Sequence, residues 1–154
     1  MVYSSALWLH SLLRWAVLFT GVIAWFISIG GASVKRPWGT KDEMWGVLFI
    51  LSLDMQALVG LGLYVFLSPF TKIAFQNLSV AMTNANLRFW AVEHISGMII
   101  GLAFAHIGRI KVRQASTDLR KQRTAAIFIG FALLAVLLAS PWPGKSAGRP
   151  LIRF

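Results

Sequence analysis

Long runs of apolar residues alternate with short polar and basic connections along this chain. Four of the runs are long enough to form helices that cross most of a membrane, at 6–30, 44–67, 87–110 and 124–140. A helix needs about 20 apolar residues to cross the hydrocarbon core of a bilayer, and it satisfies its own backbone groups there. The pattern therefore predicts an all-α fold, a single membrane-embedded four-helix domain over residues 1–154. We expect antiparallel neighbours and a first helix that is retained rather than cleaved as a signal.

The connection between the second and third runs, "TKIAFQNLSVAMTNAN", is too polar to cross a membrane. Its apolar residues recur at irregular helical spacing, which is typical of a segment that lies at a membrane surface. We expect it to lie along the outer face.

Composition supports the membrane assignment, because 57% of the 154 residues are hydrophobic and only 13% are charged. There is no cysteine, which excludes disulfides, thiolate metal sites and iron–sulfur clusters. The sequence also lacks the P-loop, H-E-x-x-H and G-x-S-x-G patterns, so it shows no signature of a nucleotide, zinc-protease or serine-hydrolase site.

The formal net charge of +10 comes mainly from basic residues between the apolar runs. Such residues signal membrane topology, so a lipid bilayer rather than nucleic acid is the expected partner. The connections before runs two and four hold nine Lys and Arg, against five on the other side. This bias predicts both termini on the outer, periplasmic side.

Polar groups inside lipid are costly and usually functional. The predicted helices hold seven such residues: His10, Arg14, Asp54, Gln56, Glu93, His94 and His106. Runs one and three point the same way, and His10 and His94 each lie one to two turns inside them, so the two imidazoles are expected at similar depth. Two histidines from different helices of an apolar bundle can bind haem b as axial ligands of the iron.

Four further residues are candidates for supporting such a haem. Arg14 lies one turn beyond His10, where it can face a propionate or pair with Asp54. Arg88 is the second propionate candidate, with a role as an interface anchor equally open. Glu93 can hold the tautomer of a ligand histidine, for which His10 is the better placed, or form an ion pair; a buried ion pair is also the expectation for Asp54.

Gly97 and Gly101 follow His94 on nearly the same helix face. Small residues there can make room for a flat macrocycle, although a G-x-x-x-G pattern equally serves close helix packing. His106 lies roughly 18 Å from His94 along the helix and about 120° around it. No fourth histidine is present to share a second haem, so His106 is expected to be a polar residue of the bundle or interface.

Three stretches, "LHSLLRW", "LVGLGLYVFLSP" and "LRFWAVEHISGMIIGLAFAHIGRIKVR", together with the "PWP" and "GRPLIRF" tail, resemble a group of small bacterial four-helix membrane proteins labelled cytochrome b-like. The resemblance covers most of the chain. It implies a multi-pass protein of the bacterial inner (cytoplasmic) membrane that binds haem b through His10 and His94. It also implies electron transfer rather than stand-alone enzyme activity, with quinone or other membrane subunits as partners.

Other functions stay open at this point. The chain can be a cofactor-free accessory or scaffold subunit whose polar residues pair across the bundle and whose basic inner loop docks a partner. A chlorophyll-type pigment with histidine as its single axial ligand is less favoured. A small transporter using Asp54, Arg14 and Glu93 is least favoured, because no predicted span contains an internal proline.

Overall fold

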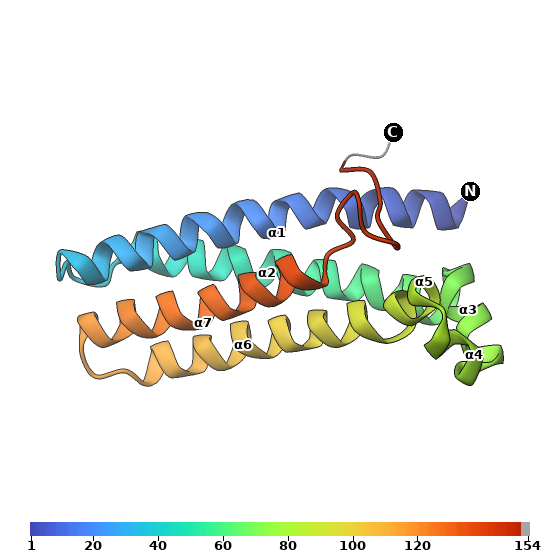
Figure 1. Ribbon diagram of the computed structural model, residues 1–154. Coiled ribbons are helices and arrows are strands. Elements are labelled where there is room, and N and C mark those ends of the chain that lie inside the picture. Colours follow the sequence, from blue (N-terminus) through green and yellow to red (C-terminus); the bar gives the residue numbers. More distant parts are fainter. Residues whose placement is uncertain (152–154) are drawn as a thin grey trace.

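A computed structural model describes residues 1–151 of the chain, and Ile152, Arg153 and Phe154 lie outside the described residues. Four long helices run side by side, and no strand is found within residues 1–151 (Figure 1). Each is long and apolar enough to cross a membrane: Val2–Ser33, Thr40–Leu67, Ala85–Gln114 and Asp118–Ala139. The prediction of an all-helical fold with four helices long and apolar enough to span a membrane is confirmed.

Two of the four spanning helices contain π-helical turns. The first helix is α1 (Val2–Ser33), and the second is α2 (Thr40–Gly62) continued by the π-helical turn η1 (Leu63–Leu67). The third span consists of α5 (Ala85–Arg88), the π-helical turn η2 (Phe89–Glu93) and α6 (His94–Gln114), and the fourth is α7 (Asp118–Ala139). π-Helical turns inside α-helices occur frequently at functional sites.

The helices are longer than the apolar runs. A helix ends where its terminal backbone groups find capping partners, and this need not coincide with the membrane boundary. α7 begins six residues before the predicted 124, where the Thr117 hydroxyl accepts a hydrogen bond from Arg120 N. At the start of α2, the Asp42 carboxylate accepts a hydrogen bond of 2.9 Å from Gly39 N. Such side-chain oxygens satisfy backbone groups that a helix end leaves unpaired.

The polar connection between the second and third spans folds into two short helices, α3 (Pro69–Gln76) and α4 (Leu78–Thr83). Ser68 Oγ caps α3, and Asn77 Oδ1 caps α4 through Val80 N at 3.1 Å. Ala74 and Ala81 are buried in a small apolar cluster with Ala91 of η2. The segment is mostly helical and closes one end of the bundle (Figure 1).

Small residues bring the long helices close together. Gly21 of α1 leaves room for Phe49 of α2 and Leu133 of α7, which belong to the main apolar core. Gly108 of α6 lies against Phe128 of α7. Contacts run in opposite senses along neighbouring helices, since His10 lies beside Gly60 while Gly21, later on α1, lies beside the earlier Phe49. The N-terminus and the C-terminal tail lie at the same end of the bundle (Figure 1).

Candidate functional site: a histidine-lined cavity

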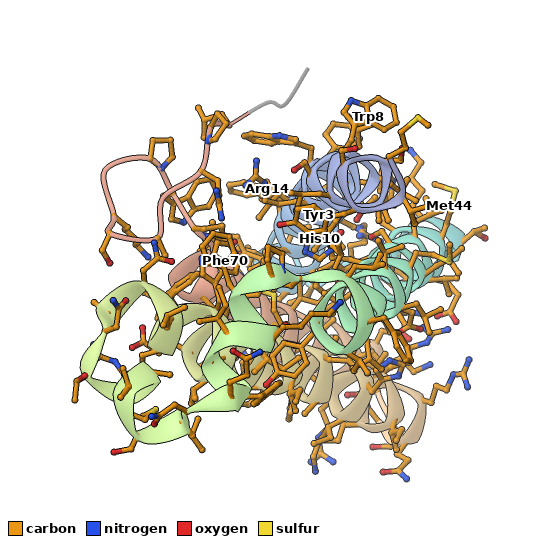
Figure 2. The ribbon with its side chains drawn as sticks, turned by 90° about the vertical axis from the view of Figure 1, so that its right-hand side faces the viewer. Tyr3, Trp8, His10, Arg14, Met44 and Phe70 are labelled. Carbon is orange, nitrogen blue, oxygen red and sulfur yellow. The ribbon has the colours of Figure 1, made fainter. Side chains whose placement is uncertain are left out.

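His10 of α1 and His94 of α6 meet inside the bundle. Their ring centroids are 6.3 Å apart and the ring planes make an angle of 77°. In the view along the bundle, His10 points inward from α1, whereas Trp8 and Met44 project outward (Figure 2). The structure therefore brings together the two histidines that the sequence singled out.

The tautomer of His94 is set by the end of α7. His94 Nδ1 lies 2.8 Å from the carbonyl oxygen of Ala139, the last residue of that helix. A carbonyl oxygen only accepts hydrogen bonds, so Nδ1 carries the proton and Nε2 keeps its lone pair. A histidine that binds a metal typically donates its other ring N–H in this way.

His10 has a different environment, because its neighbour is a side-chain amide. Its Nε2 lies 3.3 Å from Nε2 of Gln56 on α2. Its Nδ1 and Gln56 Oε1 are both buried, and neither has a hydrogen-bond partner among the described residues. Buried polar atoms nearly always have partners, so these two mark a place where a further group is expected.

The two histidines line a cavity of about 310 Å³ between α1, α2 and α6. Its walls are mainly apolar, and its polar atoms come from a few residues that include Gln56 and Tyr64. Trp90 of η2 also lines it, and its indole Nε1 is buried without a hydrogen-bond partner in the described part of the chain. Apolar walls with a few converging polar groups are typical of small-molecule and cofactor sites.

Gly60 of α2 keeps one wall of this cavity close to His10. A Cβ built on Gly60 would lie 2.9 Å from His10 Cε1, which is closer than real Cβ contacts allow. A side chain at this position would displace the imidazole. Gly60, rather than either of the two predicted glycines, thus makes room for the His10 ring.

The C-terminal tail reaches over the cavity. The guanidinium of Arg149, another lining residue, lies 4.9 Å from the ring centroid of Phe70 and 5.2 Å from that of Trp90. Arg149 N also donates to Pro141 O at 3.0 Å, which folds the tail back on itself. A cation is therefore held at the site by aromatic faces.

Arg14 holds this tail and does not pair with Asp54, so that predicted pair is wrong. Its Nη2 donates to Leu151 O at 2.5 Å, and Trp15 Nε1 donates to the same oxygen at 3.0 Å. Asp54 instead pairs with His106, with Oδ1 and Nε2 2.8 Å apart. Arg14 lies on α1 four residues after His10, where the folded tail supplies its hydrogen-bond acceptor.

Glu93 pairs with Arg88 rather than with a ligand histidine. Arg88 Nε donates to Glu93 Oε1 at 2.7 Å, and both side chains are about half exposed, at 40% and 48%. The π-helical turn between them brings their side chains together on the outside of the bundle. The expected contact of Glu93 with His10 is therefore wrong, while its alternative as an ion-pair partner is confirmed. Arg88 does not line the cavity.

Gly97 and Gly101 also lie outside the cavity lining. A Cβ on Gly97 would overlap Ala139 of α7, and one on Gly101 would lie 3.3 Å from Ala132 O. The space that these glycines leave is filled by α7, so the expectation that they make room for a macrocycle is wrong. They serve the close helix packing that was the alternative explanation.

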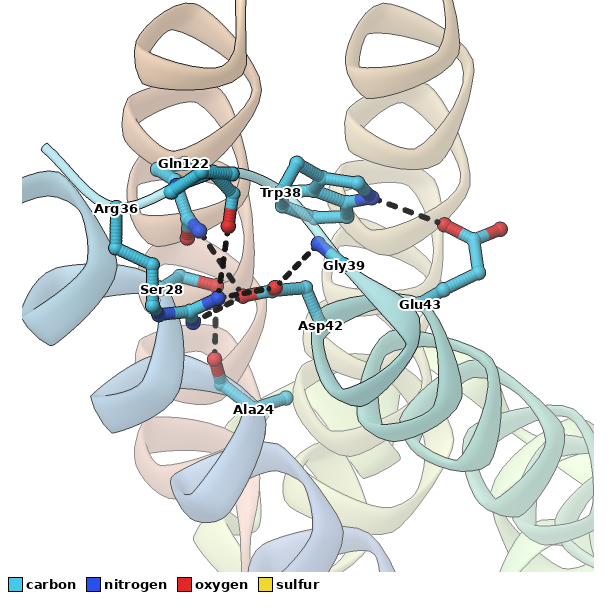
Figure 3. A network of polar contacts seen from close by, with 9 residues as sticks. Ala24, Ser28, Arg36, Trp38, Gly39, Asp42, Glu43 and Gln122 are labelled. Carbon is cyan, nitrogen blue, oxygen red and sulfur yellow. Dashed lines mark hydrogen bonds and ion pairs between the residues drawn. The ribbon is translucent and has the colours of Figure 1, made fainter.

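At the opposite end of the bundle, polar residues join the first connection to α7 (Figure 3). Arg36 forms two hydrogen bonds of 2.7 and 2.6 Å with the carboxylate of Asp42, whose side chain is fully buried, and this contact raises the pKa of Arg36. Gln122 Nε2 donates to Asp42 Oδ1 at 3.1 Å. Beside them, Trp38 and Arg109 both donate to Glu43. These contacts are structural, and the sequence pattern did not single them out.

The sequence analysis missed Gln56 and Arg149 as site residues. Gln56 was recognised as a polar residue inside a span, but its partner on α1 follows only from the helix rotation in the bundle. Arg149 was counted as a tail charge, and only the folded tail brings it to the cavity. No group of three or more His, Cys, Asp or Glu residues positioned to hold a metal ion is found within residues 1–151.

The sequence was compared with protein-family models, with curated proteins and with solved structures, and none of these comparisons gave a match.

Proposed function

We propose that this chain is a membrane-embedded, cytochrome b-like electron-transfer protein that holds one haem b between His10 and His94. The observation that carries the proposal is the meeting of the two imidazoles in one cavity, with centroids 6.3 Å apart. Metal–imidazole bonds of about 2 Å put the centroids of two imidazoles on opposite sides of one metal ion about 6 Å apart. The spacing and the donor set therefore fit a six-coordinate haem iron.

The surrounding atoms support the same proposal. Ala139 O leaves His94 Nε2 as a lone-pair donor. His10 Nδ1 is buried without a partner, and it keeps a lone pair for a metal when the Gln56 amide turns its oxygen to accept from His10 Nε2–H. A bound haem would supply one-electron exchange, for which two axial histidines are suited. The cavity walls around His10 are mainly apolar. Arg149 offers a positive charge for a propionate, a role for which Arg14 and Arg88 are less well placed.

We further propose an antiparallel bundle with both termini on the outer side of a bacterial inner membrane. The contact of Asp42 with Gln122 and that of Glu43 with Arg109 place the two strongly basic connections at one end of the bundle. Nine Lys and Arg then lie on one side and five on the other, which favours the nine-residue side as cytoplasmic. Quinone or further membrane subunits are the proposed redox partners.

A second candidate is a cofactor-free accessory subunit. It is favoured by the ion pairs inside the chain, because Asp54, Glu93, Glu43 and Asp42 each have a basic partner in the described residues. In such a protein water would satisfy the unpaired atoms of the cavity. This candidate predicts a colourless protein, whereas haem gives a strong Soret band.

A visible spectrum of the oxidised and reduced protein in mild detergent tests the proposal. We expect a six-coordinate low-spin haem spectrum that is lost in His10→Ala and in His94→Ala. His106→Ala is the matched control, because it removes a histidine of the same bundle outside the cavity and keeps the spectrum. No Soret band after expression with abundant haem would sink the cytochrome proposal, and an unchanged spectrum in either of the first two variants would refute the ligand assignment.

A further inference from the structure

An acid and a base lie together on the outer surface of the bundle, between α2 and α6. Asp54 Oδ1 and His106 Nε2 are 2.8 Å apart, and the side chains are 38% and 48% exposed. Within residues 1–151, no other hydrogen bond is made by either side chain. Asp54 Oδ2 and His106 Nδ1 therefore face outward with unused hydrogen-bonding capacity.

Asp54 and His106 lie deep within their membrane-spanning helices, so exposing their side chains to lipid would cost free energy. Asp54 lies 14 residues after Thr40 and 13 before Leu67, the two ends of its spanning helix. At 1.5 Å per residue this is roughly 20 Å from either end, near the middle of a hydrocarbon core of about 30 Å. Ionisable side chains at that depth almost always face other protein or water rather than lipid.

The neighbouring surface is apolar, as a helix interface in a membrane requires. Leu51 and Leu58 lie one turn to either side of Asp54 and are 55% and 65% exposed. On α6, Ile110 lies one turn beyond His106 and is 55% exposed. We call the surface formed by these five residues the α2–α6 patch.

We propose that a second copy of this chain covers the α2–α6 patch. The patch carries one acid and one base at the same depth, so it is complementary in charge to itself. A twofold axis along the bundle keeps that depth in the second copy and brings Asp54 of each copy to His106 of the other, as an isologous interface requires. His106 Nδ1–H then donates to Asp54 Oδ2 of the other copy.

The charges of such a dimer balance. When His106 carries a proton on both ring nitrogens, it donates one N–H to its own Asp54 and one to the Asp54 of the other copy, and two cations and two carboxylates then form a closed neutral ring. A partner of different sequence would need its own matched acid and base at this depth, whereas a second copy supplies them. The inference is independent of haem, because the patch lies outside the residues that bind it in the proposed function.

The first test is the mass of the purified full-length protein in mild detergent and in lipid nanodiscs, with or without bound haem. We expect a dimer, and a monomer in both media at micromolar concentration would overturn the proposal. The double variant Asp54→Ala with His106→Ala is expected to weaken dimerisation about tenfold or more, since it removes two interchain hydrogen bonds from lipid. The exchange of Asp54→His with His106→Asp keeps the patch self-complementary and is expected to restore the dimer. If the exchanged variant stays monomeric, the pairing is wrong.

Cysteine cross-linking locates the interface without changing the charged pair. The chain contains no cysteine, so introduced thiols report only their own positions. Because α2 of one copy faces α6 of the other in this dimer, Leu51→Cys co-expressed with Ile110→Cys in native membranes is expected to form a disulfide-linked dimer on oxidation. Leu134→Cys on α7 is the control: it is 50% exposed, and its neighbour Leu133 packs beside Phe49, at a depth close to that of Leu51. Cross-linking of Leu134→Cys without cross-linking between Leu51→Cys and Ile110→Cys would place the interface elsewhere and overturn the proposal.

Discussion

The two histidines of the cavity are held by different kinds of neighbour. His94 donates to a backbone carbonyl at the end of α7, where unpaired carbonyls and the negative end of the helix dipole strengthen the acceptor. His10 contacts the Gln56 side chain, and Gly60 has no side chain that would displace the His10 ring. Each histidine has its own neighbours, so single substitutions should affect the position of one ring without the other.

Gly60→Ala is predicted to displace His10 without removing it. The new methyl group would lie 2.9 Å from His10 Cε1, and the ring must rotate or shift to relieve the overlap. If haem is bound as proposed, its content per protein should fall and its low-spin spectrum should change.

The control for Gly60→Ala is Gly62→Ala, two residues further on. A Cβ at Gly62 meets no heavy atom within 4 Å, so its spectrum and haem content should match those of the wild type. Equal spectra for Gly60→Ala and the wild type would show that the contact with His10 does not constrain the ring.

Buried and exposed ion pairs should differ in their contribution to stability. Asp42 is fully buried and bonded to Arg36, Gly39 and Gln122. Asp42→Ala leaves the buried Gln122 and the partly exposed Arg36 without their partner, and we expect a loss of about 1–3 kcal/mol. Thermal unfolding in detergent measures it.

The comparison variant is Glu93→Ala, which breaks the half-exposed pair with Arg88. Surface ion pairs contribute about 0–1 kcal/mol, so its unfolding temperature should stay near that of the wild type. A larger loss for Glu93→Ala than for Asp42→Ala would contradict the structural role assigned to the inner network.

Among the helices, α7 supplies hydrogen-bond partners and packing contacts to the helices that carry the polar side chains. The sequence of α7 contains no ionisable group between Thr124 and Ala139. In the bundle it supplies the acceptor for His94, fills the space beside Gly97 and Gly101, and contributes Leu133 and Val136 to the core. The glycines of α6 therefore serve helix packing.

Gly108→Ala is predicted to loosen the packing of α6 against α7. Its Cβ would overlap Cβ of Phe128, which cannot move without the backbone of α7. Overpacking of this kind costs typically 1–3 kcal/mol, so the unfolding temperature should fall.

Gly46→Ala provides the control for that variant, because nothing lies within 4 Å of its new Cβ. Replacing an unhindered helical glycine with alanine favours the helix by about 0.5–1 kcal/mol. Its unfolding temperature should therefore be equal or higher. A stable Gly108→Ala protein would show that the helices separate easily at this point.

For the whole molecule, the two basic connections lie at one end of the bundle, and the N-terminus and the described part of the C-terminal tail lie toward the other. Contacts between Asp42 and Gln122 and between Glu43 and Arg109 bring the two connections together, and Figure 1 shows the N-terminus and the tail. The orientation of the bundle in a membrane then follows from which end keeps its basic residues in the cytoplasm.

Reporter fusions at the C-terminus are predicted to report the outer side. Alkaline phosphatase fused after Phe154 should be active in a bacterial host, and green fluorescent protein fused there through the ordinary secretion route should be dark. Fusions inserted between Gln114 and Asp118, in the connection of α6 to α7, should give the opposite pattern. A fluorescent C-terminal fusion would reverse the proposed orientation.

The number of long apolar helices, their approximate bounds and the polar residues inside them follow from the amino-acid sequence alone. Hydrophobic length and charge between runs are local properties, and lipid requires each helix to satisfy its own backbone. That His10 and His94 lie at similar depth was predictable too, because helix rise converts sequence position into height.

Which side chains meet depends on how the helices pack in the folded bundle. Arg14 bonds to the tail and Asp54 to His106, and Gly60 rather than Gly97 or Gly101 lies beside a proposed ligand. These outcomes depend on how each helix is rotated about its axis and on where the tail folds. Rotation is set by the packing of all four helices at once, and no single segment contains that information.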